Sequence, residues 1–490
     1  MGGYAADVRL RTLLHAADEA AYLLAHRGGS RRVDTGLRWV TRSADFSAVW
    51  VVTAGLLATT QGRPGRRAAA RGLLSVALTS AVANGPLKSA VRRSRPGNLL
   101  VPAGRVRHRA TRTSSFPSGH SASAAAFAVG AGSELPWTAA PLGAMAALVG
   151  ASRVRTGAHY PGDVVAGMAL GAGIALATRR VWPVHPPAAA LPHPAHPDPE
   201  HARPTGKGVR VVVNPDAGPG TSGSPAEVLL ARLPDLEVVE DDDLVEGLER
   251  TREGAQVLGA AGGDGSVNAT AEAALADGVP MLVVPAGTLN HFARDIGLQS
   301  ADDSADALKA GTVADVDVGL IAGEVFLNTA SIGAYVDLVH RREKLERRIG
   351  KWPAFVVALA RVLRTCPPVE VELDGVPRRA WMVFFGNCRY HPSGFAPGWR
   401  GRLDDGLVDV RVLAADVPHA RLRLVLAALT GTLSRCRAYE QKTVGSLAVR
   451  SLQGPLRLSR DGEVFDGPEA FEVTKSEQRL RVYGRAVTPA

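Results

Sequence analysis

A proline-rich run divides this 490-residue chain into two parts that fold separately. The stretch from Trp182 to Gly208 contains eight prolines. Proline fixes φ and lacks the amide hydrogen that helices and sheets need, so neither element continues through this run. We therefore predict an interdomain linker over residues 183–208, with one domain at 1–182 and another at 209–490. The linker histidines alternate irregularly with prolines, which is typical of a solvated linker and not of a metal site.

Apolar runs rich in alanine and glycine dominate the first part. These runs lie near 46–60, 68–87, 121–135, 137–151 and 164–181. Each is close to the lower length limit for crossing a bilayer core of about 30 Å. Small residues also let helices pack closely within a membrane. The expected fold is an all-α membrane helical bundle, with an amphipathic helix near 7–26 at the interface or against the bundle.

The pattern after the linker changes to strands that alternate with helices. The segments "VRVVVNP", "AQVLGAAGGDG" and "PMLVVPAGTLN" each read as a strand that ends in a turn. This pattern indicates an α/β nucleotide-binding subdomain over 209–318, with ligand loops at the carboxyl ends of its strands. Short β segments separated by Gly and Pro turns predict a β-rich second subdomain over 319–490, interrupted by a helical insertion near 336–365.

Charge and cysteine content narrow the classes of function. The formal net charge is +10 and the excess is mainly arginine, which suits phosphate groups or anionic lipid, although compositional bias alone explains it equally well. Aromatic residues make up only 5%, so stacking platforms for bases are scarce and we expect no nucleic-acid partner. The three cysteines form no CxxC pair, which disfavours a disulfide framework or a zinc site.

Three polar clusters interrupt the apolar first part. They are "LKSAVRRSRP" with Lys88 and Arg95, "PSGH" with Ser118, Gly119 and His120, and "SRVRTGAHYPGD" with Arg153, His159 and Asp163. Charges beside a membrane helix are costly unless they face a polar site. Together, the cations can neutralise phosphoryl oxygens, and Ser118 with the Gly119 amide can add donors at a helix N-terminus. The two histidines can serve as nucleophile and general acid, with Asp163 fixing the tautomer of His159.

These three motifs, in this order, resemble the type 2 phosphatidic acid phosphatase family, which shares its site with vanadium haloperoxidases. The resemblance covers roughly residues 40–182. It implies that His159 attacks phosphorus to form a phosphohistidine, that Asp163 orients this ring, and that His120 protonates the leaving oxygen. It implies no metal. The residues that it implies hold the phosphoryl group are Lys88, Arg95, Ser118, Gly119 and Arg153.

Three Gly-rich turns in the second part form another set. The segments "NPDAG", "GGDGS" and "PAGTLNHFAR" resemble the loops of the diacylglycerol kinase catalytic domain, as in the bacterial lipid kinases and sphingosine kinases. Glycine lets backbone amides approach phosphates closely. Leu289 and His291 depart from the family pattern, which weakens any transfer of their roles. The resemblance covers 209–490 and implies ATP bound by Asn214, Gly218, Gly262, Gly263, Asp264, Gly265, Ser266, Asn268 and Thr288.

Two acidic segments extend this resemblance. "RLDDGLVDV" resembles the family's structural Mg²⁺ loop, which implies Asp405 as a ligand beside the carbonyl groups of Arg402 and Leu407. "SRDGEVF" resembles the segment that supplies the general base. It implies that Asp461 deprotonates a lipid hydroxyl and that Glu463 supports the Mg–nucleotide network. Taken singly, both segments are ordinary turns, because Asp-Gly favours turns.

The two motif sets predict a bifunctional membrane lipid enzyme. One half would dephosphorylate a lipid phosphate or diphosphate, and the other would phosphorylate a diacylglycerol-like lipid hydroxyl with Mg-ATP. We expect a multi-pass protein of the cell membrane, with an anionic membrane surface as partner. Three alternatives remain: a helical domain that is mainly an anchor, a kinase-like module that only senses lipid or nucleotide, and a soluble haloperoxidase-type enzyme.

The orientation of the chain follows from where ATP is found. ATP is cytosolic, so we expect a cytoplasmic kinase domain and a phosphatase mouth at the opposite end of the last apolar segment. The arginines between 63 and 71 then lie inside, as the positive-inside rule expects. The arginine-rich loop 92–112 lies outside and breaks that rule.

Overall fold

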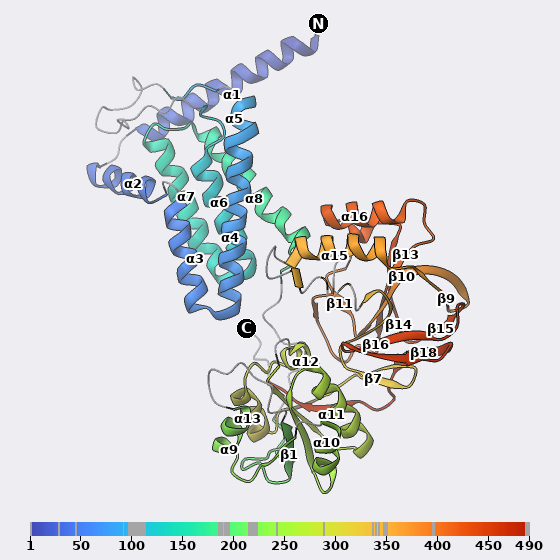
Figure 1. The fold of residues 1–490 in the computed structure, drawn as a ribbon. Helices are drawn as coiled ribbons and strands as arrows, with labels where there is room; N and C mark the ends of the chain where they lie inside the picture. Colours follow the sequence, from blue (N-terminus) through green and yellow to red (C-terminus); the bar gives the residue numbers. More distant parts are fainter. Residues whose placement is uncertain are drawn as a thin grey trace. The chain divides into compact units, whose positions relative to one another are not determined.

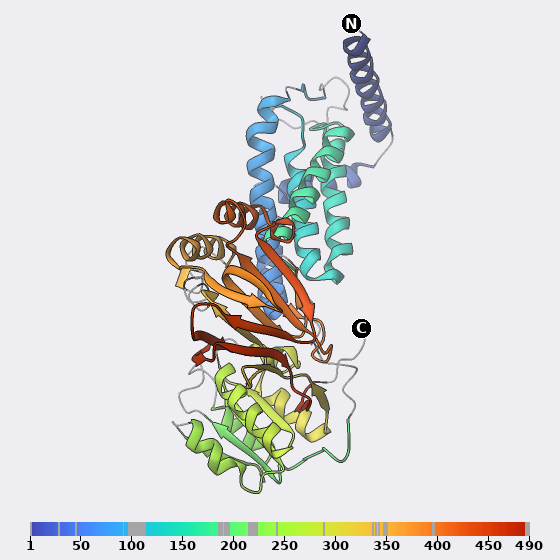
Figure 2. The same ribbon diagram turned by 90° about the vertical axis from the view of Figure 1, so that its right-hand side faces the viewer.

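The chain forms two compact units, Met1–Pro187 and Ala188–Ala490, and the boundary between them falls within the predicted linker. The structure is a computed structural model (Figures 1 and 2). The residues that the structure describes are 2–27, 30–44, 47–91, 93–96, 114–184, 190, 197–213, 224–241, 244–287, 290–335, 338, 341, 344–345, 351–393 and 397–485.

The first unit is a helical bundle, as the sequence predicts. Helix α6 is its central element and packs against α4, α7 and α8. Close approach depends on glycine, because a side chain at Gly167 would meet the Ser118 carbonyl oxygen at 2.5 Å. The helices are α1 (Gly2–His26), α2 (Arg31–Ser43), α3 (Ala48–Thr60), α4 (Gly62–Val82), η2 (Ala83–Leu87), α5 (Lys88–Ala90), α6 (Gly119–Glu134), η5 (Pro136–Thr138), α7 (Ala139–Arg155) and α8 (Pro161–Val181).

Fewer helices of this unit are long and apolar enough to cross a membrane than the five predicted runs. Among the described residues only α8 passes, and α2 with α3 passes if this bent pair is taken as one span. Helices α6 and α7 are 16 and 17 residues long, shorter than a typical spanning helix. Large apolar side chains are nevertheless exposed on the bundle, among them Val51, Val52, Leu56, Leu78 and Val165.

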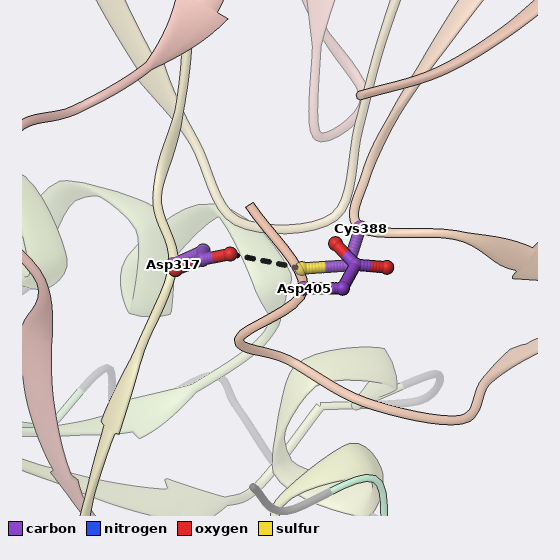
Figure 3. Close-up of side chains that lie close together, drawn as sticks. All are labelled: Asp317, Cys388 and Asp405. Carbon is purple, nitrogen blue, oxygen red and sulfur yellow. Dashed lines mark hydrogen bonds between the residues drawn. The ribbon is translucent and has the colours of Figure 1, made fainter. Parts of the chain in front are cut away.

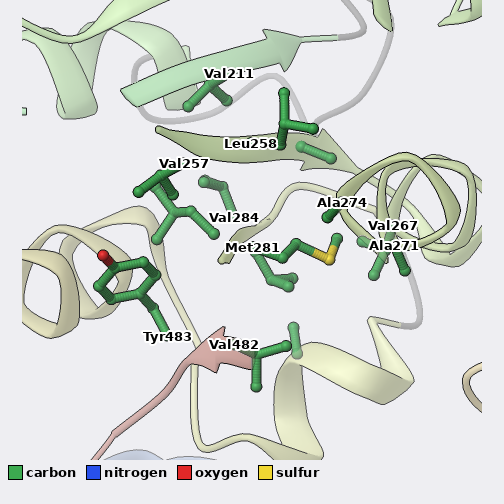
Figure 4. Close-up of a cluster of buried hydrophobic side chains, with 14 of the residues drawn as sticks. Val211, Val257, Leu258, Val267, Ala271, Ala274, Met281, Val284, Val482 and Tyr483 are labelled. Atoms are coloured by element: carbon green, nitrogen blue, oxygen red, sulfur yellow. The ribbon is translucent and has the colours of Figure 1, made fainter. Parts of the chain in front are cut away.

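The second unit begins with an α/β subdomain built on a six-stranded sheet of order β2-β1-β3-β4-β19-β5. Strands β1 (Val209–Val213), β3 (Val257–Gly262) and β4 (Met281–Pro285) are parallel neighbours, so the turns that follow them meet at one edge of the sheet. The core lies between this sheet and α11 (Asp264–Asp277) (Figure 4). Its side chains include Val211, Leu258, Met281, Ala271 and Ala274.

The remaining elements of this subdomain complete the predicted alternation of strands and helices. They are α9 (Pro225–Arg232), β2 (Glu237–Glu240), α10 (Leu244–Arg252), α12 (His291–Asp295), α13 (Ala301–Ala310) and β5 (Val313–Val316).

The β-rich subdomain is an eleven-stranded sheet, and its longest strand, β10 (Val376–Asn387), pairs with β8, β9 and β13. Helices α15 (Lys351–Thr365) and α16 (Ala420–Thr430) lie side by side on this subdomain (Figures 1 and 2). The other elements are β6 (Gly319–Ile321), β7 (Glu324–Phe326), β8 (Thr329–Gly333), β9 (Val369–Leu373), β11 (Tyr390–His391), β12 (Trp399–Arg400), β13 (Val408–Ala414), η6 (Leu433–Arg435), β14 (Tyr439–Val444), β15 (Leu447–Ser451), β16 (Leu456–Arg460), β17 (Glu463–Gly467) and β18 (Ala470–Lys475).

The last strand, β19 (Leu480–Tyr483), does not belong to the β-rich sheet. It pairs with β5 in antiparallel fashion and with β4 in parallel fashion. The predicted division at residue 318 therefore needs correction, because the β-rich subdomain is inserted between β5 and β19 of the α/β sheet. The sequence shows that "RLRVYG" is a strand, but its sheet is decided by contacts with residues far away in the chain.

Candidate functional sites

His159 lies in the short connection between α7 and α8 and is almost completely buried. Its Nδ1 is 2.7 Å from the Ser115 carbonyl oxygen and 3.7 Å from Asp163 Oδ2. A carbonyl oxygen only accepts, so Nδ1 carries the hydrogen and Nε2 keeps its lone pair. This Nε2 lies 3.5 Å from a terminal nitrogen of Arg95. The ring therefore presents its unprotonated nitrogen to a cation.

Positive charge surrounds this ring. Burial, together with the charges of Arg153 and Arg95, lowers the pKa of His159 from 6.5 to about 4. Burial, Arg95 and Arg153 also lower the pKa of Lys88. The three predicted phosphate ligands therefore act on one place, although they come from separate parts of the chain. Neighbouring cations repel one another, so such a group favours an anion between them.

Asp163 has partners that the sequence does not indicate. We expect from the sequence that it fixes the tautomer of His159, but the Ser115 carbonyl is the nearer acceptor for that ring. Asp163 Oδ2 accepts the Tyr160 amide at 3.0 Å, and its Oδ1 accepts a hydrogen bond from Arg93 at 2.7 Å. Asp163 therefore holds the connection between α7 and α8 as well as facing His159.

Arg93 is a residue of this site that sequence reasoning missed. Its second terminal nitrogen donates to Asp18 Oδ2 at 2.6 Å, and its guanidinium lies 4.5 Å from the centroid of the Tyr160 ring. Asp18, on α1, also accepts the Gly162 amide at 2.7 Å. Arg93 thus connects helix α1 to Asp163. The only sequence signal is one more arginine in "RRSRP", which does not distinguish Arg93 from its neighbours.

The start of α6 brings the second motif to the same place. A side chain at Gly119, the first residue of α6, would lie 3.8 Å from Lys88 Nζ, which donates to Asn84 Oδ1 at 2.7 Å. His120 is half-buried in the first turn of this helix. The Ser118 amide donates to the Asp163 carbonyl at 3.0 Å. The Ser118 hydroxyl shares a 2.9 Å hydrogen bond with the Ser121 hydroxyl. Because the Ser118 amide is already used, only the hydroxyl of Ser118 could make the predicted phosphate contact.

A second arginine cluster lies at the opposite end of α8. Arg71 is fully buried and donates to Glu134 at 2.7 Å and to Thr178 at 3.1 Å, and Arg67 donates to the other oxygen of Glu134 at 2.9 Å. The sequence assigns these arginines to a cytosolic surface. Arg71 is not a surface charge, because it is buried and Glu134 neutralises it inside the bundle. The side of the membrane predicted for this end stays a prediction.

The turn after β3 carries the predicted GGDGS segment into α11. Gly262 ends the strand, and a side chain there would meet the Ser266 hydroxyl at 2.6 Å. A side chain at Gly287, in the turn after β4, would meet the Cα of Gly263 at 2.5 Å. The two turns therefore touch, and glycine is required for this contact. Gly263 is the N-cap of α11, where amide groups and the helix dipole favour an anion.

Two of the predicted ATP-binding side chains have structural partners. Asp264 accepts the His291 amide at 2.9 Å, which joins the two turns, and burial raises its pKa. Asn268 is buried and its side-chain nitrogen donates to the Val325 carbonyl at 3.1 Å, so it ties α11 to β7. The predicted residues that lie outside the described residues are Asn214, Gly218 and Thr288.

Asp461 sits in a tight turn between β16 and β17. Its carboxylate accepts the amides of Leu327, Asn328 and Thr329 at 2.7, 2.9 and 2.9 Å. Burial raises its pKa to about 6, the three amides oppose that rise, and the Asp264 charge adds to it. A carboxylate with a pKa near 6 is ionised at neutral pH and is more basic than an ordinary aspartate.

Glu463 lies two residues beyond and is exposed. Its Oε1 is 3.2 Å from the position that a side chain at Gly265 would occupy. The acidic segment of the β-rich subdomain therefore faces the glycine turn of the α/β subdomain, as the order of the motifs predicts.

The acidic loop around Asp405 supplies oxygen donors. Asp405 accepts the amides of Leu407 at 3.0 Å and Arg389 at 2.9 Å, one on each carboxylate oxygen. Each oxygen keeps a further lone pair, and the Arg402 side chain pairs with Asp404 at 2.8 Å, away from its own carbonyl. Carboxylate and carbonyl oxygens are the ligands that Mg²⁺ prefers, so this loop fits the predicted ion.

A second group of side chains that includes Asp405 fits Mg²⁺ poorly. Asp317, Cys388 and Asp405 lie close together, with a 3.7 Å contact from the Cys388 thiol to Asp317 (Figure 3). Burial raises the pKa of this thiol to about 12, and a thiol is a soft ligand. The Lys475 ammonium lies 3.8 Å from Asp317 and 3.4 Å from the sulfur. It already supplies positive charge there.

Comparison with known families confirms the resemblance of both halves. Residues 69–186 match the PAP2 superfamily, and residues 208–321 match the diacylglycerol kinase catalytic domain. The chain therefore joins a PAP2 superfamily region to a region that matches the diacylglycerol kinase catalytic domain.

Individual relatives cover parts of the chain. The diacylglycerol kinase of Bacillus subtilis (strain 168) is 31% identical over 182 residues, which are 35% of this chain and 59% of that protein. A probable lipid kinase YegS-like protein of Pseudomonas aeruginosa (strain UCBPP-PA14) is 29% identical over 246 residues, which are 48% of this chain and 79% of that protein. A transmembrane PAP2 type phosphatidylglycerolphosphate phosphatase from Bacillus subtilis, with a solved structure, is 22% identical. The match covers 34% of this chain and 83% of the phosphatase chain, with a TM-score of 0.27.

Proposed function

We propose that this protein is a bifunctional membrane lipid enzyme, with a lipid phosphatase site in its helical unit and an ATP-dependent lipid kinase site in its second unit. The observation that carries the phosphatase proposal is the ring of His159. Its Nδ1–H is held by the Ser115 carbonyl, and its Nε2 points to the Arg95 guanidinium. This is the arrangement that a neutral nitrogen nucleophile needs to attack a bound phosphate.

The phosphatase reaction proceeds in two steps. His159 Nε2 attacks phosphorus, and the bond from phosphorus to the lipid oxygen breaks as His120 gives that oxygen a proton. Water then attacks the phosphohistidine and releases phosphate, with His120 accepting the water proton. Lys88, Arg95 and Arg153 bind the phosphoryl oxygens throughout. The low pKa of His159 keeps its ring neutral and ready before each turnover.

The kinase reaction uses the carboxylates that lie near the start of α11. Asp461 takes the proton of a diacylglycerol-like lipid hydroxyl, whose oxygen then attacks the terminal phosphorus of ATP. The bond from that phosphorus to the β-phosphate oxygen breaks, and ADP leaves. Gly262, Gly263, Gly265 and Ser266 bind the phosphates at the start of α11. The loop of Asp405, with the Arg402 and Leu407 carbonyls, would hold a structural Mg²⁺ ion, which would supply positive charge to that loop. The contact between Glu463 and Gly265 supports this placement.

Glu463 is a second candidate for the base. Asp461 is held by three amides, whereas the Glu463 carboxylate is exposed beside the phosphate turn. The variants Asp461→Asn and Glu463→Gln separate the two roles. If Asp461 is the base, Asp461→Asn loses lipid phosphorylation by on the order of a hundredfold or more while Glu463→Gln keeps most of it. The reverse ranking assigns the base to Glu463.

One assay series tests both halves together. Purified full-length protein is given a panel of lipid phosphates and, separately, a panel of lipid alcohols with Mg-ATP. We expect His159→Ala to abolish phosphate release without changing ATP-dependent lipid labelling, and Asp461→Asn to do the opposite. Loss of both activities in either variant would contradict two independent sites. Retention of phosphate release in His159→Ala would contradict the phosphohistidine.

The membrane assignment has its own support. Helix α8 is long and apolar enough to span a bilayer, and the bundle exposes large apolar side chains. We propose a multi-pass location in the cell membrane with the kinase unit in the cytoplasm, where ATP is found. Protease protection in oriented membrane vesicles tests this topology, since the second unit is cleaved only when the cytoplasmic face is outside.

A further inference from the structure

Helix α16 presents an apolar stripe to the outside. Leu422, Leu426 and Leu429 are 59, 51 and 44% exposed. Their spacing places them on one face of the helix. The opposite face is already buried, with Leu424, Ala427 and Ala428 packed in the core beneath α15 and α16. The stripe therefore adds nothing to the core of this subdomain, and water contact with three leucines is unfavourable.

Helix α15 extends the same surface. It lies beside α16 in both views of the fold (Figures 1 and 2). Val357 is 43% exposed on it, and Arg361 and Arg364 are exposed toward its C-terminal end. We call the exposed side chains of these two helices and of the segment that follows α16 the α15/α16 surface.

The charge of this surface has one sign. Neither α15 nor residues 417–438 contain aspartate or glutamate. The exposed cations that accompany the stripe are Arg421, Arg423, Arg435 and Arg437. Apolar side chains flanked by arginine, without acids, are typical of helices that lie in the interface of an anionic membrane.

We infer that the α15/α16 surface docks on an anionic lipid bilayer, with the leucine stripe in the interface and the arginines against lipid phosphates. The inference deepens the proposed kinase function and rests on it, because a diacylglycerol-like acceptor is reached only from its membrane. Helix α16 belongs to the β-rich subdomain that also carries Asp461 and Glu463. Docking through α16 therefore holds at the membrane the subdomain that carries these two carboxylates.

A spin label reports this docking in the full-length chain. The label is attached to Leu426→Cys in a background with Cys366→Ser and Cys436→Ser, since Cys388 is buried. The control label is attached to Leu230→Cys, which is 43% exposed on α9. In vesicles of phosphatidylcholine with phosphatidylglycerol, we expect oxygen access to rise and access of a water-soluble nickel chelate to fall several-fold at position 426, and neither to change at 230. Phosphatidylcholine alone should give a smaller change.

Charge reversal tests the role of the arginines. Arg423→Glu with Arg437→Glu should reduce the docked population, relative to the undocked one, by at least about tenfold. Free access of the nickel chelate at position 426 would overturn the inference. Shielding of position 426 from both oxygen and the nickel chelate in every vesicle would also overturn the inference. It would indicate that a protein partner covers the α15/α16 surface.

Lipid labelling on the same samples separates this inference from the kinase proposal. Docking without ATP-dependent labelling would contradict the kinase function, whereas the inference that the α15/α16 surface docks on the membrane would stand. Labelling of a detergent-dispersed acceptor without docking in vesicles would contradict the membrane surface alone.

Discussion

Basic side chains from other elements gather near both ends of helix α8, but their surroundings differ. At one end, Arg67 and Arg71 donate to the single carboxylate of Glu134, which neutralises them. At the other end, burial together with Arg95 and Arg153 lowers the pKa of both His159 and Lys88. A buried acid therefore neutralises one arginine cluster, whereas positive charge remains in excess at the other, where it favours an anion. The number of arginines does not distinguish the two.

The largest expected effect is at the neutralised end. Glu134→Gln leaves Arg71 buried without its counter-charge, which should lower the free energy of unfolding by about 3–5 kcal/mol. Thermal unfolding in detergent measures this change, and the folded fraction should keep its phosphatase kcat. Glu19→Gln, an exposed pair with His15, is the control and should change little. A loss of kcat without a loss of stability in Glu134→Gln would contradict a structural role for the cluster of Arg67 and Arg71.

Arg153→Lys tests the end with excess charge. It keeps the positive charge but loses the planar fork that binds two phosphoryl oxygens, so kcat/KM for phosphate release should fall about a hundredfold. The unfolding temperature should move little. Arg155→Lys is the matched control two residues along α7, where the side chain pairs with Asp34 at 3.0 Å and lies outside the site. Equal losses in both variants would argue against a special role for Arg153.

Arg93→Ala sharpens the comparison, because Arg93 is an arginine at the active end that is balanced by acids. We expect kcat for phosphate release to fall about tenfold while KM stays nearly constant, since Arg93 positions Asp163 and does not touch phosphate. Asp18→Asn should show the same split in weaker form, and Arg93→Lys should restore part of the rate. A rise in KM alone would instead place Arg93 among the phosphate ligands.

The smallest effect is the pH dependence of stability. The folded pKa of His159, about 4, lies below its unfolded value of 6.5, so its contribution is fully present above pH 6.5 and is lost as the pH falls toward 4. Near pH 5.5 the loss is about 1 kcal/mol. Unfolding temperatures of the wild type and His159→Gln, measured from pH 7.5 to pH 4.5, should converge as the pH falls. Parallel curves would contradict the depressed pKa.

The sequence predicts the elements of both halves well, because each depends on local patterns. Apolar runs become helices, and turns after β3 and β4 meet because parallel neighbours end at one edge. The motif residues from Lys88 to Asp163 also act on one place. Arg93 could not be predicted, since its partner Asp18 lies on a distant helix whose docking leaves no local pattern. For the same reason, the sequence could not predict that Asn268 is buried against Val325 or that Arg71 is buried against Glu134.

Strand β19 gives the kinase half a fixed order of assembly. It lies between β4 and β5 in the α/β sheet, yet it follows every other strand of that sheet in the sequence. The nucleotide-binding sheet is therefore incomplete until the ribosome has made residue 483, when the helical unit and the whole β-rich subdomain have already been synthesised. The proposed phosphoryl transfer from ATP would have to wait for β19, whereas every residue of the proposed phosphatase site is synthesised more than half a chain length earlier.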